Sequence, residues 1–257
     1  MPERLTVLGS SDAFNSAGRL HSCYLLEGDG FGPIMVDFGA TAMVALRRAG
    51  RAPTELAGLA ITHLHGDHVG GFPFLLIDGM FKGVRTAPLP ILGPVGVTQR
   101  LADGIRLAYG DLMDREMPFT TSFEELAPGD RAVLAGAEVT AFPAEHMDPP
   151  EQPLCLRFRL PSDKVVAFSG DTMMCDGLLG AAAGADLLVA ECTGLAPPAG
   201  RHCTWEDWER VLPTMGVPRV VLSHLNDAVR ARADDLLDRA PPGIELSFAD
   251  DGMIVDL

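Results

Sequence analysis

Three histidines and one aspartate crowd into one short segment, and this segment constrains the fold more than any other part of the sequence. Residues 62–68 read Thr-His-Leu-His-Gly-Asp-His, with the apolar run Leu59–Ile61 before them and a helical pattern after them. The segment predicts a strand-to-helix turn in which several side chains point at one spot, and Gly66 is expected to allow its tight path. Imidazole and carboxylate groups are the ligands expected for zinc, and iron or manganese also accept them.

Other histidines and a further aspartate follow predicted strands later in the chain. His146 and Asp171 come shortly after apolar strand patterns, and His224 directly follows another. His202 lies in a loop before a predicted helix. A single histidine at a strand end is most often an ordinary surface or capping residue. Strand ends that collect on one edge of a sheet make a site, so together with residues 62–68 these side chains favour metal binding.

Short apolar runs alternate with helical patterns along the chain, without a repeat or a low-complexity linker. The predicted strands are Leu5–Leu8, Cys23–Leu26, Ile34–Asp37, Gly58–Thr62, Ile91–Gly93, Glu138–Phe142, Leu154–Leu160, Val165–Ser169, Leu187–Ala190, Val220–Leu222, Ile244–Phe248 and Met253–Val255. The predicted helices are Thr41–Ala49, Gly70–Phe81, Val95–Tyr109, Gly177–Ala183, Trp205–Met215 and Asp227–Asp238.

This order of elements favours two packed sheets covered by helices on their outer faces, because antiparallel strands come first and alternating strand–helix units follow in each half. Thr204, with Asp207 three residues later, is typical of a helix start. The segment Asp103–Pro128 is expected to form a helix and a long loop that cover the site.

Size and composition predict one globular domain over residues 1–257. Hydrophobic residues make up 47% and charged residues 21%, which argues against disorder. No apolar run reaches the roughly 18–20 residues that span a bilayer. The first residues show no secretory signal pattern, so no membrane partner is expected.

The cysteine count and the net charge narrow the compartment and the partners. Five cysteines without a CxxC pair argue against a disulfide framework and favour a reducing cytoplasm. The formal net charge is −15, with 20 Lys+Arg against 35 Asp+Glu. A surface that grips a long nucleic acid is usually basic, so a nucleic-acid partner is disfavoured.

The histidine and aspartate pattern resembles that of the metallo-β-lactamase superfamily, whose HxHxDH motif matches residues 63–68. The resemblance runs over nearly the whole chain and implies the four-layer αβ/βα sandwich, an α+β fold with two mixed sheets flanked by helices. It also implies two divalent cations, most simply zinc. One would bind His63, His65 and His146, the second would bind Asp67, His68 and His224, and Asp171 would bridge them. Asp37 is expected to hold a histidine or the motif loop rather than to bind metal.

Within the superfamily the chain is similar to the ribonuclease Z and phosphodiesterase branch. The similarity lies in Gly71-Phe72-Pro73 after the motif, in Ser169-Gly170-Asp171-Thr172, and in the loop His202-Cys203-Thr204. Histidine at position 65, where di-iron oxygen-reducing members have glutamate, favours hydrolysis. Aspartate at position 171, where zinc β-lactamases have cysteine, argues against antibiotic cleavage.

One feature of ribonuclease Z is missing from this sequence. Asp171 follows His146 by only 25 positions, which suffices for two strands and a turn but leaves no room for the long basic arm that clasps tRNA. Together with the acidic charge, this favours a small or cyclic nucleotide-like or sugar phosphodiester as substrate.

The resemblance implies attack on phosphorus by a hydroxide that bridges the two metals. Asp67 would take the proton of the water as well as bind metal, and His202 would contact the phosphoryl oxygen or protonate the leaving group. Thr204, Asn15 and His21 are predicted to line the substrate pocket.

Several alternatives remain open from the sequence. The same metal pair would serve an ester, thioester, lactone or sulfate-ester hydrolase. An RNA 3′-end processing endonuclease and a non-catalytic metal-binding regulator are further alternatives. The family resemblance also suggests a homodimer.

Overall fold

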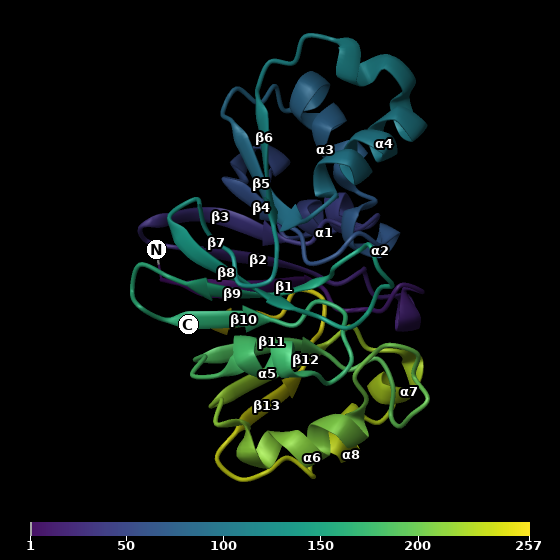
Figure 1. The fold of residues 1–257 in the computed structure, drawn as a ribbon, viewed down its shortest axis with the longest axis vertical. Coiled ribbons are helices and arrows are strands. Elements are labelled where there is room, and N and C mark those ends of the chain that lie inside the picture. The colour runs from purple at the N-terminus through teal and green to yellow at the C-terminus, as the bar shows by residue number, and fades with distance from the viewer. Residues whose placement is uncertain (1) are drawn as a thin grey trace.

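The computed structural model describes residues 2–257 and arranges the strands in two seven-stranded sheets, with helices outside both (Figure 1). The first sheet has the order β14-β1-β2-β3-β4-β5-β6. Its strands are β1 (Arg4–Gly9), β2 (Cys23–Gly28), β3 (Phe31–Val36), β4 (Gly58–Ala60), β5 (Leu89–Pro94), β6 (Thr121–Leu126) and β14 (Ile254–Asp256). Pairing is antiparallel from β14 to β3 and parallel from β3 to β6.

The second sheet repeats this plan with the order β13-β12-β11-β10-β9-β8-β7. Its strands are β7 (Arg131–Leu134), β8 (Ala137–Pro143), β9 (Leu154–Arg159), β10 (Val165–Phe168), β11 (Leu187–Glu191), β12 (Arg219–Ser223) and β13 (Glu245–Phe248). Pairing is antiparallel from β7 to β10 and parallel from β10 to β13. The predicted αβ/βα sandwich with two mixed sheets is confirmed.

Helices cover the outer face of each sheet, and Figure 1 shows α1, α3 and α4 on the opposite side of the molecule from α5, α6 and α8. The α-helices are α1 (Ala42–Arg48), α2 (Gly66–Val69), α3 (Phe72–Ile77), α4 (Val97–Tyr109), α5 (Asp176–Ala182), α6 (Trp205–Met215), α7 (Asp227–Arg230) and α8 (Ala233–Leu237). Short helical turns are η1 (Ser16–Gly18), η2 (Pro53–Glu55), η3 (Asp78–Lys82) and η4 (Gly110–Asp114).

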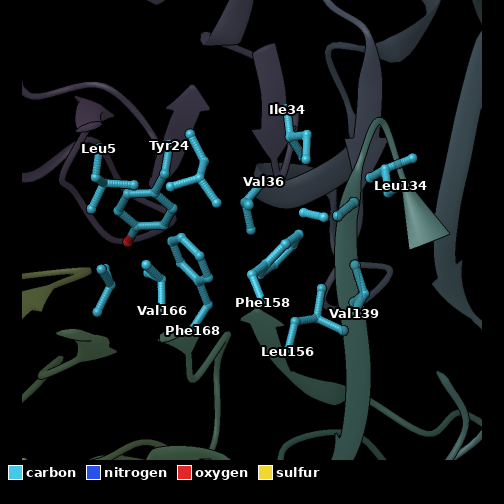
Figure 2. Packing of buried hydrophobic residues seen from close by; sticks show 14 of the residues in the cluster. Leu5, Tyr24, Ile34, Val36, Leu134, Val139, Leu156, Phe158, Val166 and Phe168 are labelled. Atoms are coloured by element: carbon cyan, nitrogen blue, oxygen red, sulfur yellow. The ribbon is translucent and has the colours of Figure 1, made fainter. Parts of the chain in front are cut away.

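The main core lies between the two sheets, where apolar side chains of both inner faces meet (Figure 2). The ring of Phe168 in β10 packs against Tyr24 of β2 at 5.4 Å and against Phe158 of β9 at 5.5 Å, measured between ring centroids. Each fully buried side chain of this size contributes about 1.5–3 kcal/mol. Two further buried clusters fill the spaces between each sheet and its helices, so the loops at the strand ends stand on a well-packed base.

The structure corrects the prediction for residues 103–128. The helix α4 ends at Tyr109, and Thr121–Leu126 then forms strand β6, which pairs with β5 along the sheet edge. The expected long loop over the site was therefore wrong in its second half. Strand β6 lies at the edge of the sheet, and its positions before Leu126 are only partly buried or exposed, with Glu124 and Glu125 among them. The sequence of β6 therefore lacks the apolar pattern that marks the buried strands.

Two predicted helices are interrupted in the structure. The helical pattern at 70–81 starts earlier, at Gly66, and breaks at Gly70-Gly71 before α3, where Pro73 lies in the first turn. The pattern at 227–238 forms two short helices, α7 and α8. Within residues 2–257, no helix has the length and apolarity needed to cross a bilayer. All five cysteines are buried and free.

Candidate metal centre

The side chains predicted as metal ligands converge from both sheets at one edge of the sandwich. They are His63 and His65 in the β4–α2 connection, Asp67 and His68 in α2, His146 after β8, Asp171 after β10 and His224 after β12. Within the described part of the chain, four overlapping groups have ligand atoms within 4.8 Å of one another, and two of them consist of predicted ligands alone: His63, His65 and His146 form one, and Asp67, His68, Asp171 and His224 form the other. The structure therefore brings all seven residues together, and Asp171, expected from the sequence as a bridge, falls in the second group.

Asp171 lies between the two groups. Its Oδ2 atom is 3.7 Å from Nε2 of His63 and 3.8 Å from Nε2 of His146, and it is 3.2 Å from Nε2 of His224. Its Oδ1 atom is 3.4 Å from Nε2 of His68. The side chain is almost fully buried. One carboxylate thus contacts both groups, which is the arrangement a bridging ligand requires.

Hydrogen bonds behind the histidines fix which ring nitrogen faces the cluster. The Thr193 hydroxyl donates to Glu191 and therefore accepts from Nδ1 of His224, 2.8 Å away. The Thr62 hydroxyl donates to Asp37 and in the same way accepts from Nδ1 of His63, 3.1 Å away.

Two more imidazoles of the cluster are held in the same manner. Nδ1 of His68 donates to Asp37 over 2.8 Å, and Nδ1 of His146 donates to the carbonyl of Arg201 over 3.0 Å. In all four rings the Nδ1 atom carries a proton, so Nε2 is the atom that faces the centre.

The atoms that face the centre fit divalent cations. Nε2 of His63, His68 and His224 is buried in each case and has no hydrogen-bond partner. Unpartnered polar atoms at full burial are rare and costly. Imidazole lone pairs and carboxylate oxygens that face one another repel unless a positive charge lies between them. Nitrogen and oxygen donors in this number match zinc, with manganese or iron as alternatives.

Charges within the cluster shift its pKa values strongly. Burial opposes ionisation of Asp171, yet the charges of His224 and His68 hold the pKa of that carboxyl well below its usual range. Burial likewise opposes a charge on His224, but Asp171 and Asp67 outweigh it and raise the pKa of His224 to about 9. Burial, followed by the charge of His68, holds the pKa of His63 well below its usual value. The cluster thus combines carboxylates that favour nearby positive charge with one imidazole, His63, that stays neutral.

Close backbone packing positions the motif loop. A Cβ atom on Gly39 would lie 1.7 Å from the carbonyl oxygen of Asp67, so only glycine permits this approach. The amide of Phe38 donates to the carbonyl of His68 over 2.6 Å and ties the β3–α1 connection to α2. Gly66, in contrast, has open space around its Cβ position and no left-handed backbone, so its predicted role in a tight path was wrong.

Two residues of the centre adopt a left-handed backbone without being glycine. Asp37 has φ of 59° and His224 has φ of 54°. Such conformations cost about 1–3 kcal/mol and persist where surrounding contacts enforce them. Asp37 repays this cost by accepting from the amide and hydroxyl of Thr62 and from His68. The structure therefore places Asp37 behind His68 and the motif loop.

His202 lies at the margin of the centre and pairs with a glutamate. Its Nδ1 atom donates to Oε1 of Glu191 over 2.8 Å and is 4.0 Å from Oδ2 of Asp171. Burial disfavours the charged form of this ring and by itself lowers the pKa. The hydrogen bond and the charge of Glu191 outweigh burial and raise the pKa of His202. The ring is 20% exposed, whereas Glu191 is almost fully buried.

Glu191 was missed in the sequence, although it carried a usable signal. It ends the apolar run Leu187–Glu191, in the same way that Asp171 follows an apolar strand. Its two oxygens accept from His202, from the amide of Thr172 and from the hydroxyl of Thr193. An acidic residue at the end of a buried strand is therefore worth treating as a site candidate.

The predicted substrate-pocket residues have different fates. His21 is buried, and its ring feels the charges of Asp67, His68 and His224. Asn15 is half-buried and donates to the carbonyl of Arg19, which closes its own loop.

Thr204 does not line the pocket as predicted. It is 1% exposed, its hydroxyl donates to the carboxylate of Asp207, and it forms the predicted capping box at the start of α6. The Thr204 side chain caps the helix, and because it is buried it is not accessible to a substrate.

Comparison with known proteins agrees with this fold. The chain is 27% identical to "Ribonuclease Z" of Methanothermobacter thermautotrophicus, over 98% of this chain and 96% of the relative. It resembles the solved metallo-β-lactamase fold protein YhfI from Bacillus subtilis at a TM-score of 0.80 and 21% identity, covering 100% of this chain and 99% of that one.

A second solved structure is described as a new diphosphatase from the PhnP family. It matches at a TM-score of 0.78 and 16% identity and covers 99% of this chain and 98% of its own. The predicted resemblance to the metallo-β-lactamase superfamily and its ribonuclease Z branch is confirmed.

The profile of one family matches residues 3–238, which is most of the chain. That family is described as "Anti-Pycsar protein Apyc1". The matched range contains every residue of the candidate metal centre, from His63 to His224. The chain therefore belongs to the anti-Pycsar protein Apyc1 family and has the metallo-β-lactamase fold.

Proposed function

We propose that this protein is a dinuclear metal-dependent hydrolase that cleaves a small phosphodiester. The observation that carries the proposal is the convergence of two donor groups on Asp171, with unpartnered imidazole nitrogens facing inward. His63, His65 and His146 would hold one cation, and Asp67, His68 and His224 the other, with Asp171 shared. When bound, the two cations would supply Lewis-acid stabilisation of a phosphoryl group and lower the pKa of water.

Asp67 is the carboxylate of the centre best placed to handle a proton. Its side chain is 12% exposed, whereas Asp171 is 4% exposed, so Asp67 faces the space that a substrate can enter. Oδ2 of Asp67 lies 3.5 Å from Nε2 of His224 and 3.2 Å from Nε2 of His68, and these two rings overcome the effect of burial and keep the pKa of Asp67 well below its usual range. Asp67 is therefore an anion at neutral pH and can orient a water and accept its proton.

His202 would act on the opposite side of the reaction. Glu191 raises the pKa of the His202 ring, which favours its protonated form, and it holds the ring at 4.0 Å from Oδ2 of Asp171, at the edge of the centre. An alkoxide is a poor leaving group, and its departure from phosphorus is assisted by a proton donor. The pair supports a phosphodiester substrate, because the cationic ring also suits an anionic phosphoryl oxygen.

Charge and chain length support a small substrate. The net charge of −15 disfavours a long polyanion held by the bulk surface. Between His146 and Asp171 the chain forms β9, a turn and β10, with no inserted arm. The related structure described as a diphosphatase fits a compact phosphate ester. We favour a cyclic or small nucleotide-like phosphodiester or a sugar phosphodiester.

The first test is hydrolysis of bis(p-nitrophenyl) phosphate by protein of measured metal content, comparing wild type with Asp171→Ala and Asp171→Asn. We expect bound metal to fall in both variants and turnover to fall by more than about a hundredfold, because even partners behind metal ligands cost 10–100-fold. Asp163→Asn is the matched control, since Asp163 is 77% exposed, pairs with Arg159 at the surface, and has a left-handed backbone that asparagine tolerates.

The outcomes separate the parts of the proposal. Metal-dependent turnover that both Asp171 variants lose supports a dinuclear phosphodiesterase. Bound metal without turnover on any phosphodiester would overturn the substrate class and point to esters, thioesters, lactones or sulfate esters. Unchanged metal content in both variants would overturn the bridging role of Asp171.

A further inference from the structure

The connection between β1 and β2, residues 10–22, runs along the edge of the metal centre. Ser11 forms bridges to His21 and to Leu225, the residue after His224, and the amide of Leu225 donates to the carbonyl of Ser10 over 3.2 Å. In Figure 1 this purple connection lies between α2, which carries Asp67, and α7, which follows His224. We call residues 10–22 the rim loop.

A buried carboxylate holds the rim loop from inside. Asp12 is 2% exposed, and its oxygens accept from the hydroxyls of Ser11 and Ser16 and from the amides of Phe14 and Ser16. These distances lie between 2.8 and 3.2 Å. Hydrogen bonds to charged groups are stronger than neutral ones, so the backbone around Phe14 is firmly held.

Two further carboxylates tie the rim loop to the rest of the molecule. Asp251 accepts from the amides of Ser10 and Leu20, each at 3.0 Å, and Asp227 of α7 accepts from the amide of Ala17 at 2.7 Å. Within the loop, Asn15 and Ala17 have φ of 54° and 53°, a left-handed backbone that an alanine adopts only where contacts enforce it. The loop is thus held in a costly shape, which is typical of functional segments.

The side chain that this held backbone presents is Phe14, and it is 87% exposed. Exposed phenylalanines also occur at Phe74 and Phe81, but these are 47% and 61% exposed and lie in α3 and η3. Phe14 is linked to the centre through its neighbour: the backbone of Ala13 contacts the ring of His21. The Cβ atom of His21 and the carbonyl oxygen of Asp67 lie 3.1 Å and 1.7 Å from the same point, the Cβ position of Gly39. An apolar ring therefore stands in water on a firmly held backbone, and the neighbouring residue, Ala13, contacts His21 beside the motif loop.

We propose that Phe14 provides a stacking face for the planar base of a nucleotide phosphodiester and thereby selects base-bearing substrates over base-free ones. The inference rests on the phosphodiesterase function proposed above. The phenyl ring offers no hydrogen-bonding atom, so it recognises a flat aromatic surface and not the identity of a particular base. A fixed backbone lowers the entropy cost of this contact.

The experiment compares two matched probes that differ only in the base. One is a nucleoside 3′,5′-cyclic monophosphate, and the other is methyl riboside 3′,5′-cyclic phosphate, in which a methoxy group replaces the base. We expect Phe14→Ala to raise KM for the nucleotide by about tenfold with kcat unchanged, since stacking of this kind has that magnitude. KM for the base-free probe stays as in wild type. Phe14→Trp restores the low KM, and Phe14→Leu does not.

Phe81→Ala is the matched control, because it removes another exposed phenylalanine outside the rim loop. A second measurement is independent of turnover: calorimetric binding of a nucleoside 5′-monophosphate against ribose 5-phosphate. Phe14→Ala is expected to weaken only the first by about tenfold. If wild type cleaves bis(p-nitrophenyl) phosphate but neither cyclic probe, the proposed hydrolase stands without a cyclic substrate, and if it cleaves no phosphodiester the proposed function fails; in both cases this binding comparison still decides the role of Phe14.

Three results would overturn the inference. One is an equal effect of Phe14→Ala on base-bearing and base-free probes. Another is no effect on either probe or on nucleotide binding. The third is dissociation of an oligomer in Phe14→Ala together with an effect that depends on protein concentration, which would assign Phe14 to contact with a second copy of the chain.

Discussion

At the scale of single residues, the centre depends on side chains that never face the metal space. Thr193 donates to Glu191 and so can only accept from His224, which fixes the tautomer of that histidine. Glu191 also holds His202. One buried glutamate therefore orients a predicted metal ligand and a predicted proton donor at once, and its removal affects both.

The role of Glu191 is tested by the pH dependence of turnover in Glu191→Gln. The hydrogen bond and charge of Glu191 raise the pKa of His202, so the protonated ring persists to higher pH than an ordinary histidine. Glutamine keeps the shape but removes the charge, which lowers the pKa of His202. If protonated His202 is required, kcat of the variant declines at lower pH than kcat of wild type, while the two approach each other under acidic conditions.

Glu206→Gln is the control for this measurement. Glu206 lies close by in the first turn of α6 but is exposed, so it changes the net charge equally without contacting His202. If kcat of wild type and of Glu191→Gln declined at the same alkaline pH, with metal content unchanged, the role given to Glu191 and His202 would be contradicted.

At the scale of elements, each part of the centre comes from a loop at a strand end. The β4–α2 connection carries the motif, and the ends of β8, β10 and β12 supply His146, Asp171 and His224. These loops depend on their neighbours: the β3–α1 connection supports the motif through Phe38 and Gly39. The precision of the site therefore lies in contacts between loops as much as in each loop.

Gly39→Ala tests this dependence. A Cβ atom there would lie 1.7 Å from the carbonyl oxygen of Asp67, so α2 must shift. We expect the free energy of unfolding to fall by about 1–3 kcal/mol, as for overpacked cores, and metal affinity to fall with it. Denaturant unfolding in the presence of a chelator isolates the packing effect from metal loss.

Gly66→Ala is the paired substitution, since its Cβ would meet no atom within 4 Å and its backbone is helical. We expect it to leave the free energy of unfolding unchanged or to raise it by up to about 1 kcal/mol, because alanine favours helix over glycine. A larger loss at Gly66 than at Gly39 would refute this account of the motif loop.

At the scale of the whole molecule, the centre joins the two sheets. His63, His65, Asp67 and His68 follow a strand of the first sheet, whereas His146, Asp171 and His224 follow strands of the second. Cations bound between them would crosslink the two halves of the sandwich. Binding to the folded state alone stabilises a protein by mass action.

Metal removal is therefore expected to destabilise the fold. At a free metal concentration 100 times the Kd of a site, bound metal stabilises the fold by about 2.7 kcal/mol. A chelator should therefore lower the free energy of unfolding by about that amount for each site. Denaturant unfolding with buffered zinc and with chelator measures the difference, and Asp171→Ala should show a much smaller response. Identical unfolding curves for wild type with and without metal would argue against cations that bridge the sheets.

The sequence alone was sufficient for the fold class and for the grouping of the seven residues, because both follow from local signals. Alternating apolar runs mark most buried strands, and histidine and aspartate at their ends mark the site. Residues such as His146 and His224 could be selected in this way without any coordinates. The edge strand β6 could not, because its backbone partner is β5, supplied by a distant segment, and its own residues are partly acidic.

The tertiary structure decided the contacts whose energy depends on distance between segments far apart in the chain. In the folded chain Glu191 accepts a hydrogen bond from His202, and Thr204 caps a helix. The position where only glycine fits is Gly39 and not Gly66. Residue type and spacing state what a side chain is able to bind. Hydrogen bonds and close packing act over a few ångströms only, so the folded chain alone determines which partner each side chain meets.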